Sequence, residues 1–291
     1  MKPPVFEYIA ATSIGMAVAA LAEAGGEAKV LAGGQSLMPM LNFRLLRPSI
    51  LVDINRIPGL GFIEETPDSI RIGALTRHFA LETSPLVARH FPVLSCAMTH
   101  VAHLAIRNRG TIGGSLSHAD PAAELPMLAM LLDAEFHIVS SEGSRPVAAR
   151  DFFLDALTVD LGGADIVTEI VLSKLPPNTG WGFEEVARRH GDFALAAVAA
   201  TLTVSGGAIA QARLALTGVG PKPLRVAQAE ALLIGHALDA ELIGRIVGAV
   251  RDGIAPETDL HASSDYRRHL AGVLTGRALA AAWDRAIASA A

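Results

Sequence analysis

The sequence predicts an α+β protein, in which α/β units come first along the chain and a small antiparallel sheet with helices follows. Over the first half, short apolar runs alternate with segments of helical length, which is typical of α/β units. Two apolar runs then flank Gly206–Gly207, as the strands of a β-hairpin do. From Leu224 onward the chain is rich in Ala, Leu and Arg at helical spacing, which predicts helices.

The first α/β unit combines one helix with two short strands. Ser13 is a suitable N-cap for a helix through residues 14–24, and Gly25–Gly26 predicts that the helix ends in a left-handed turn. The apolar run at residues 28–34 stops at glycine and predicts one strand, and residues 49–54 predict the other.

The middle of the chain continues with mixed elements. Residues 69–75, SIRIGAL, alternate apolar and polar side chains, as a half-buried strand does. Helices are predicted at residues 92–103 and 122–133. Further strand-like runs are at residues 134–141, 144–150 and 165–172.

A domain boundary is predicted at Leu175-Pro176-Pro177-Asn178. Two adjacent prolines disfavour both regular helix and sheet, and the local polarity rises there. The chain is therefore expected to divide into residues 1–175 and 178–291.

Composition excludes several classes of protein. The 291 residues are 51% hydrophobic and 18% charged, which is typical of a globular protein. The net charge of -5 argues against a nucleic-acid partner, which would normally be met by a basic face. A single cysteine, Cys96, cannot form an internal disulfide or ligate an iron–sulfur cluster. No signal peptide or apolar run of about 18 residues is present, so a soluble, cytoplasmic protein is expected.

Two glycine pairs carry the strongest functional signal. Ala32–Ser36 reads AGGQS and Thr111–Ser115 reads TIGGS. Glycines in a turn adopt positive φ, and their backbone N–H groups then converge on one point, where they bind phosphate oxygens. The serine that follows each pair adds a hydroxyl donor. Two such turns could therefore bind the two phosphates of one dinucleotide.

Other interpretations of these residues need to be weighed. The Walker and Rossmann phosphate motifs are both missing. Ser117, His118 and Asp120 are too close in sequence to converge as a hydrolase triad. His100 and His103, three apart on a predicted helix, share a face and could pair with His118, Asp120 or Glu124 around a metal. Each glycine pair could also be a purely structural turn.

Longer stretches of the sequence resemble a known family. IRNRGTIGGS with ADPAAELP, ARRHGDFALAAVAA and SSDYRRHLAGVLTGRALAAA are similar to the FAD-binding medium subunits of molybdenum hydroxylases. This family includes the medium subunit of carbon monoxide dehydrogenase and has relatives in xanthine dehydrogenase and N-heteroaromatic hydroxylases. The resemblance covers nearly the whole chain. The sequence around residues 100–120 is more similar to the branch of the family that oxidises N-heterocycles than to carbon monoxide dehydrogenase itself.

The resemblance implies a PCMH-type FAD-binding domain of two α/β subdomains, residues 1–57 and 58–175. A C-terminal domain with a small antiparallel sheet and helices closes over the flavin. It also implies that the two glycine segments bind the FAD diphosphate, that Val101 and Phe193 lie against the flavin, and that Glu124 approaches it. The implied contacts are Leu31, Ala32, Gly33, Gly34, Gln35, Ser36, Leu37, Val101, Thr111, Ile112, Gly113, Gly114, Ser115, Glu124 and Phe193.

The chain departs from the family pattern at two places. Gln35 stands where relatives often have histidine, and glutamine can still donate and accept hydrogen bonds. Glu184 and Glu185 stand near a position where some relatives have a lysine aimed at the flavin. A carboxylate close to the flavin would disfavour the anionic reduced form and lower its potential. Phe193 could alternatively be an ordinary core residue.

The implied activity is electron transfer as one subunit of an oxidoreductase. Molybdopterin and [2Fe–2S] clusters are expected on a large and a small partner subunit, assembled as a dimer of heterotrimers, because this chain lacks the cysteines for a cluster. FAD accepts electrons from the cluster and releases them to an external acceptor, so no catalytic side chain and no metal ligand is predicted. The alternatives are a non-redox scaffold on the same fold and a metal-dependent hydrolase using His100 and His103.

Overall fold

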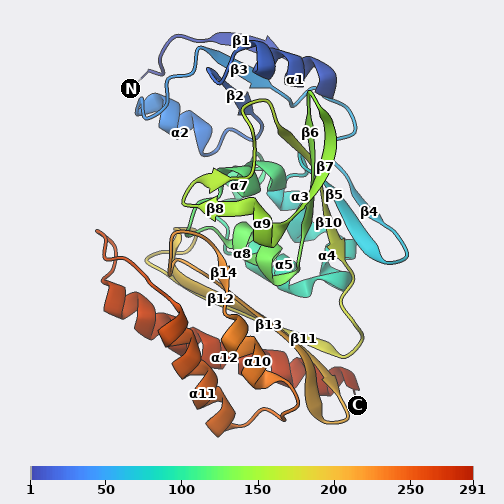
Figure 1. The fold of residues 1–291 in the computed structure, drawn as a ribbon, viewed down its shortest axis with the longest axis vertical. Helices are drawn as coiled ribbons and strands as arrows, with labels where there is room; N and C mark the ends of the chain where they lie inside the picture. The colour runs from blue at the N-terminus through green and yellow to red at the C-terminus, as the bar shows by residue number, and fades with distance from the viewer. Residues whose placement is uncertain (1, 291) are drawn as a thin grey trace.

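The computed structural model describes residues 2–290, which form three parts stacked along the long axis of the molecule (Figure 1). The N-terminal unit contains a parallel three-stranded sheet with the strand order β1-β3-β2. Its elements are β1 (Glu7–Ala10), α1 (Ile14–Glu23), β2 (Ala28–Leu31), α2 (Leu37–Asn42) and β3 (Ile50–Asp53).

Helix α1 forms as the sequence predicts. The Ser13 side chain caps it by accepting a hydrogen bond from the Met16 amide at 3.2 Å. The helix buries Val18 and Leu21 against the sheet. Gly25 and Gly26, with φ of 55° and 96°, follow its end in the left-handed region that favours glycine.

The central unit contains a five-stranded antiparallel sheet with the order β4-β5-β10-β6-β7. A bidentate pair at 2.6 Å between Arg71 and Glu169 ties β5 to β10. The strands of this sheet are β4 (Ile63–Glu65), β5 (Ser69–Gly73), β6 (Glu135–Ser140), β7 (Gly143–Ala148) and β10 (Ile166–Ser173). A separate two-stranded antiparallel sheet is formed by β8 (Phe153–Asp155) and β9 (Thr158–Val159). The helices are α3 (His78–Thr83), α4 (Pro85–His90), α5 (Pro92–Met98), α6 (Leu104–Arg107), α7 (Ile112–His118), α8 (Glu124–Leu131) and α9 (Ala149–Phe152).

The C-terminal part is a four-stranded antiparallel sheet covered by helices. Its sheet has the order β11-β12-β13-β14, and Gly206 and Gly207 form the predicted hairpin turn with φ of 60° and 80°. Its elements are β11 (Thr179–Ala187), β12 (Ala194–Ser205), β13 (Ala208–Thr217), β14 (Leu224–Arg225), α10 (Ala227–Leu233), α11 (Ala240–Gly253) and α12 (Ser264–Ala290).

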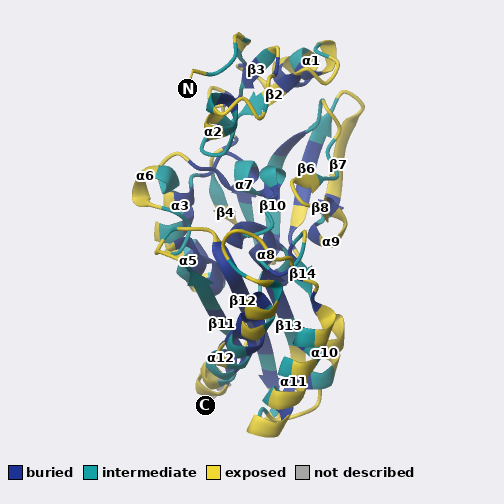
Figure 2. Cartoon of the chain, turned by 90° about the vertical axis from the view of Figure 1, so that its left-hand side faces the viewer, coloured by how far each residue is buried: buried dark blue, intermediate teal, exposed yellow. Residues whose placement is uncertain are grey.

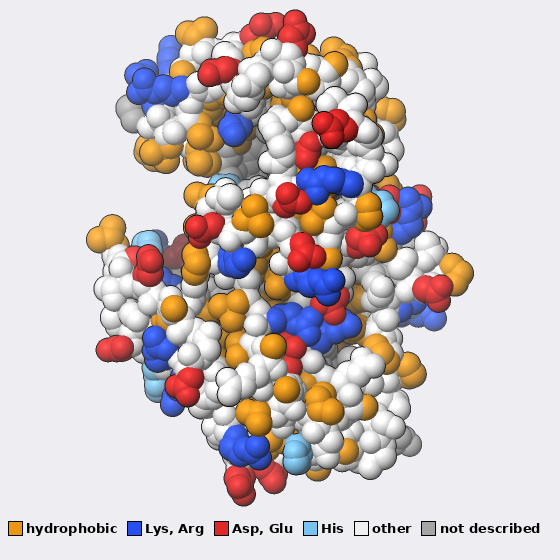
Figure 3. Space-filling view, viewed as in Figure 1, with side chains coloured by type: hydrophobic (Ala, Val, Ile, Leu, Met, Phe, Trp, Pro, Cys, Tyr) orange, Lys and Arg blue, Asp and Glu red, His pale blue; other side chains and the backbone are white. Residues whose placement is uncertain are grey.

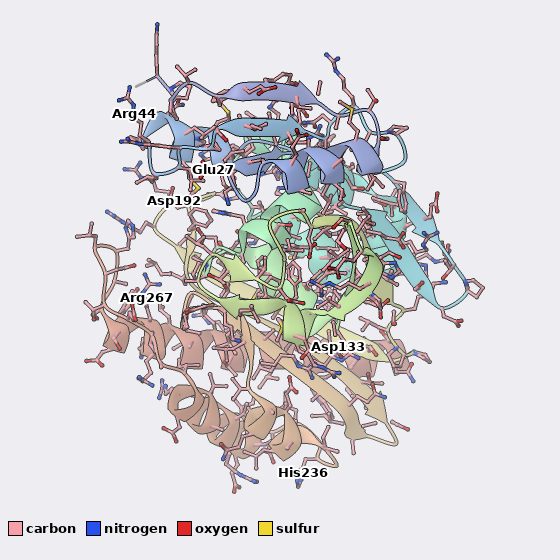
Figure 4. All side chains as sticks on the ribbon, turned by 45° about the horizontal axis from the view of Figure 1, so that its top comes forward. Glu27, Arg44, Asp133, Asp192, His236 and Arg267 are labelled. Atoms are coloured by element: carbon pink, nitrogen blue, oxygen red, sulfur yellow. The ribbon has the colours of Figure 1, made fainter. Side chains whose placement is uncertain are left out.

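This sheet is buried on both faces (Figure 2). Helices α5 and α8 of the central unit contact one face, and α12 covers the other (Figure 1). Gly180 and Gly182 allow the close approach of α12, because a Cβ on either would overlap the backbone of that helix. Asp133, labelled in Figure 4, pairs with Arg213 at 3.1 Å and with Arg225 at 2.5 Å across the same junction.

The structure confirms the predicted α+β class, and it differs from the prediction near His100. The helix predicted at residues 92–103 ends at Met98, and Ala102 has a left-handed φ of 46°. His103 is the N-cap of the next helix, α6. His100 and His103 therefore do not share a helix face. No helix among the described residues is long and apolar enough to span a membrane.

Candidate functional site

The two glycine pairs lie side by side, between the N-terminal unit and the central unit. A Cβ on Gly33 would fall 2.5 Å from the Arg109 carbonyl oxygen, and one on Gly114 would lie 3.9 Å from the Ala32 Cβ. The surface is hollowed between these two units on the left of Figure 3. The fold thus brings together the first glycine segment (residues 31–37) and the second glycine segment (residues 111–115).

The first glycine segment presents a row of free amides. Among the hydrogen bonds of the described residues, none is donated by the amides of residues 33–37. The first amide of this region with a backbone acceptor is Met38, which donates to the Gly34 carbonyl at 3.0 Å. Gly34 has a φ of 73°, so a side chain here would be strained. These five consecutive amides therefore have no hydrogen-bond acceptor among the described residues.

Gln35 shapes this segment from within. Its side-chain Nε2 donates to the Gly33 carbonyl at 2.8 Å. The bond links the side chain of Gln35 to the backbone two residues earlier and so closes the turn. Gln35 therefore acts on the conformation of the segment through its own donor.

The second glycine segment is the first turn of helix α7, and the prediction of a turn with free glycine amides is wrong there. The amides of Ile112 and Gly113 donate to the carbonyls of Thr76 and Ala74 at 3.0 and 2.9 Å. The Gly114 amide donates to the Thr111 hydroxyl, the side-chain cap of α7, at 3.2 Å. A Cβ on Gly113 would lie 2.6 Å from the Ala74 Cβ, so glycine is needed there for close packing.

The ring of His78 packs against the start of the second glycine segment. Its Nε2 lies 3.0 Å from the Thr111 carbonyl oxygen, and a Cβ on Gly110 would lie 2.9 Å from its ring. Burial lowers the pKa of His78 to about 4, so the ring is neutral near pH 7 and Nε2 donates to Thr111. Its Nδ1 is buried and has no partner among the described residues.

The remaining predicted contacts differ in exposure. Phe193 is 58% exposed, so the alternative that it is a core residue is wrong. Val101 is half-buried against the central core. Glu124, at the start of α8, is only 4% exposed. Burial, helped by the charge of Glu185, raises the pKa of Glu124 to about 8.

Glu185 is the buried member of the acidic pair on β11. Its side chain is 3% exposed, and Oε1 lies 3.7 Å from Nδ1 of His100. Its Oε2 has no hydrogen-bond partner among the described residues. Among the described residues Glu185 has no lysine or arginine partner. The chain is therefore acidic near the position where some relatives have a lysine.

The metal-site alternative finds no support in the geometry. His100 packs against Phe183, with ring centroids 5.0 Å apart, and His103 lies beside Gly191. Within residues 2–290 no group of three or more His, Cys, Asp or Glu side chains could hold a metal ion.

Two polar residues beside the glycine segments were not identified from the sequence. Asn55 follows β3 and donates to the Ala32 carbonyl, and Arg77 precedes α3 and donates to the Arg109 carbonyl, two residues before the second segment. A usable signal for Asn55 is its position just after β3 of the parallel sheet, because ligands of such sheets gather at the carboxyl ends of the strands, whereas Arg77 follows an antiparallel strand and carries no such signal.

The donor set fits a diphosphate. Free amides of residues 33–37 and the hydroxyls of Ser36 and Ser115 are the groups that bind phosphate oxygens at compact glycine-rich sites. Glycine at Gly33 and Gly114 lets the two segments lie close together, because a Cβ on Gly33 would overlap the Arg109 carbonyl oxygen and one on Gly114 would overlap the Thr111 hydroxyl.

Comparison with known families agrees with this geometry. Residues 4–175 match the FAD binding domain in molybdopterin dehydrogenase. Residues 181–282 match the CO dehydrogenase flavoprotein C-terminal domain.

Individual relatives match over almost their whole length. The 6-hydroxypseudooxynicotine dehydrogenase complex subunit alpha of Paenarthrobacter nicotinovorans is 42% identical, over 98% of this chain and 97% of the relative. Carbon monoxide dehydrogenase from Hydrogenophaga pseudoflava has a solved structure with a TM-score of 0.96 and 41% identity, over 98% of this chain and 99% of that one. Quinoline 2-oxidoreductase from Pseudomonas putida 86 gives a TM-score of 0.94 and 38% identity, over 99% and 100%.

Both family matches and the whole-length relatives point to one assignment, and the glycine segments supply the site that it requires. The chain belongs to the FAD-binding subunits of the molybdenum hydroxylase family, which are oxidoreductase subunits.

Proposed function

We propose that the chain binds FAD across its two glycine segments and passes electrons from [2Fe–2S] clusters on a partner chain to an external acceptor. The observation that carries the proposal is the row of free amides at residues 33–37, placed directly beside the start of α7. The family match to an FAD binding domain supports FAD as the nucleotide.

The proposed FAD contacts are the residues predicted from the sequence. The second glycine segment has a different proposed role, because its glycine amides already have acceptors. Amides of the first glycine segment bind the diphosphate, while the second segment contributes hydroxyl groups and the surface of α7. Val101, Glu124 and Phe193 border the flavin. The proposed contacts are Leu31, Ala32, Gly33, Gly34, Gln35, Ser36, Leu37, Val101, Thr111, Ile112, Gly113, Gly114, Ser115, Glu124 and Phe193.

FAD, when bound, supplies the redox chemistry of the subunit. The residues of this chain bind the cofactor, fix its orientation and exclude water from it. Glu124 is protonated near pH 7, so it offers a hydrogen-bond donor where a carboxylate would only accept. None of these roles requires a nucleophile, so no catalytic side chain is proposed.

The proposed assembly contains a large molybdopterin-binding chain and a small iron–sulfur chain, with each heterotrimer paired into a dimer. Two relatives support partner chains by name, a "complex subunit alpha" and a carbon monoxide dehydrogenase "medium chain". The single cysteine supports placement of the clusters on another chain. A cytoplasmic location and the domain division at residues 175–178 stay predictions.

Spectroscopy and reduction of the purified complex test this function. The chain purified with its partners should carry one FAD, released intact on denaturation, and its visible absorbance should bleach when the complex's substrate is added. Bleaching by substrate should be lost when the iron–sulfur chain is left out. A chain that is folded yet takes up no FAD would refute the proposal and leave the scaffold alternative.

A further inference from the structure

A chain of hydrogen bonds joins the two sides of the proposed cofactor site. Asn55 Nδ2 donates to the Ala32 carbonyl at 2.8 Å, at the start of the glycine pair. Asn55 Oδ1 accepts from one terminal amino group of Arg77 at 2.8 Å. The other terminal amino group of Arg77 donates to the Arg109 carbonyl, the same oxygen that lies against Gly33.

The orientation of Asn55 is fixed by its neighbours. Asp53 Oδ1 accepts from the Asn55 amide at 2.8 Å and from its Nδ2 at 2.7 Å. The hydroxyl of Tyr8 donates to the second oxygen of Asp53 at 2.5 Å. With Nδ2 held by two acceptors, the Asn55 oxygen must face the guanidinium of Arg77, which can only donate.

The guanidinium geometry of Arg77 suits this role. Its planar fork donates in two directions at once, whereas a lysine ammonium is a compact charge on a flexible stem. Bonds to Asn55 and to Arg109 lie on opposite sides of the gap between the N-terminal unit and the central unit. The backbone segment at Thr111 also pairs with Arg77 as an isolated bridge, so the position of Arg77 and that of the second glycine segment are coupled.

The charges around Arg77 also suit an anion nearby. Burial and the positive charge of Arg109 lower the pKa of Arg77, and Asp53 only partly offsets this. A negative group that approached Arg77 would favour its charged form and oppose this lowering.

We propose that Asn55 and Arg77 are positioning residues that form a clamp, which holds the two glycine segments at the separation that FAD requires before FAD binds. The inference rests on the proposed function, because the clamp has a purpose only if a diphosphate lies between the segments. Preorganisation of this kind raises affinity because the ordering cost is met during folding and not during binding.

The test uses the full chain, freed of flavin, with single variants N55A and R77Q and the double variant. R77K keeps the charge but removes the fork. R245Q is the matched control, because Arg245 is exposed on α11 in the C-terminal part and the same charge is removed. FAD affinity is measured by titration, visible circular dichroism reports the environment of the bound flavin, and thermal unfolding confirms that each variant is folded.

The clamp predicts that N55A and R77Q each weaken FAD binding at least about tenfold, with altered flavin dichroism, while R245Q binds as the wild type does. The double variant should bind no more weakly than the weaker single variant, because both remove one shared device. R77K should not recover the affinity. Additive losses would show that the two residues act independently and would overturn the clamp. Full recovery in R77K with an unaffected N55A would show that only charge matters and would overturn it as well.

Hydrogen–deuterium exchange of the flavin-free protein separates this failure from failure of the proposed function. The hydrogen-bonded amides within residues 28–31 and 106–114 should exchange faster in N55A and R77Q than in the wild type, and R245Q should not differ. Unchanged exchange would refute the clamp even if FAD binds tightly. If N55A and R77Q exchange faster than the wild type as expected, but the wild-type chain binds no FAD, the proposed function is refuted, and with it the cofactor role of the clamp.

Discussion

Gly33 of the N-terminal unit lies against Gly110 of the central unit, although the two residues are far apart in the sequence. A Cβ on Gly33 would fall 2.9 Å from the Gly110 Cα, closer than real Cβ contacts allow. The backbone of the first glycine segment therefore meets residues 109–110, directly before the second segment, only because a side chain is missing. This contact converts two separate glycine motifs into one site.

Replacing Gly33 by alanine should push the segments apart. The change is expected to lower the free energy of unfolding by about 1–3 kcal/mol, because backbone atoms must move, and to weaken FAD binding at least about tenfold. Chemical denaturation and FAD titration measure the two effects. G15A is the control, because Gly15 lies in α1 with open space around its Cβ position, and alanine favours helix. If G33A matched G15A in affinity, the close contact would have no role in binding.

Phe193 separates a cofactor role from a packing role. Because it is 58% exposed, F193A should change the free energy of unfolding by no more than about 0.5 kcal/mol. The visible absorbance and circular dichroism of bound FAD should nevertheless change, since the proposed contact of the ring with the flavin is lost. F183A gives the contrast, because Phe183 is 8% exposed in the core and its loss should cost about 3 kcal/mol. Visible spectra of bound FAD that stay unchanged in F193A would place the ring elsewhere.

His78 should make the protein less stable in acid. Its pKa is about 4 in the folded state against 6.5 for the free side chain, so its contribution is complete above pH 6.5. As the pH falls toward 4, the unfolded chain binds a proton that the folded chain refuses, and stability is lost. Between about pH 7 and about pH 5 the loss should approach 2 kcal/mol. H78Q should remove this loss, as chemical denaturation at the two pH values can show.

Glu124 should act in the opposite direction. Its pKa is about 8 in the folded state against 4.5 for the free side chain, so its contribution is complete below pH 4.5 and is lost as the pH rises toward 8. Between about pH 5 and about pH 7 the wild type should therefore lose about 2.5 kcal/mol of stability that E124Q does not lose. The slopes of His78 and Glu124 partly cancel in the wild type between pH 4.5 and 6.5, so the single variants are needed. An E124Q curve parallel to that of the wild type would contradict a protonated Glu124.

Much of the architecture could be predicted because local signals decide it. Ser13 and Gly25–Gly26 determine the ends of α1, and Gly206–Gly207 determine the hairpin, through contacts within a few residues. Strand β11 was not anticipated, since Gly180 and Gly182 make its sequence weakly apolar. Those glycines are explained only by the close approach of α12, which no local pattern reveals.

The functional site, like the fold, could be predicted from the sequence only in part. The glycine pairs were visible in the sequence, but the use of their amides was not, because it depends on acceptors from distant elements. The Gly113 amide is engaged by Ala74, and so the second segment is a helix start where a turn was predicted. Asn55 and Arg77 carry no motif, and their importance follows only from the bonds that cross between units.

The most direct test of the account is a ¹H–¹⁵N NMR titration of the flavin-free chain with FAD. Saturable binding should be accompanied by downfield shifts of the amides of residues 33–37, since these donors gain phosphate acceptors, while the already bonded amide of Gly113 should move little. No saturable binding, or shifts confined to amides away from residues 31–37 and 111–115, would contradict the claim that these two segments bind the diphosphate of FAD.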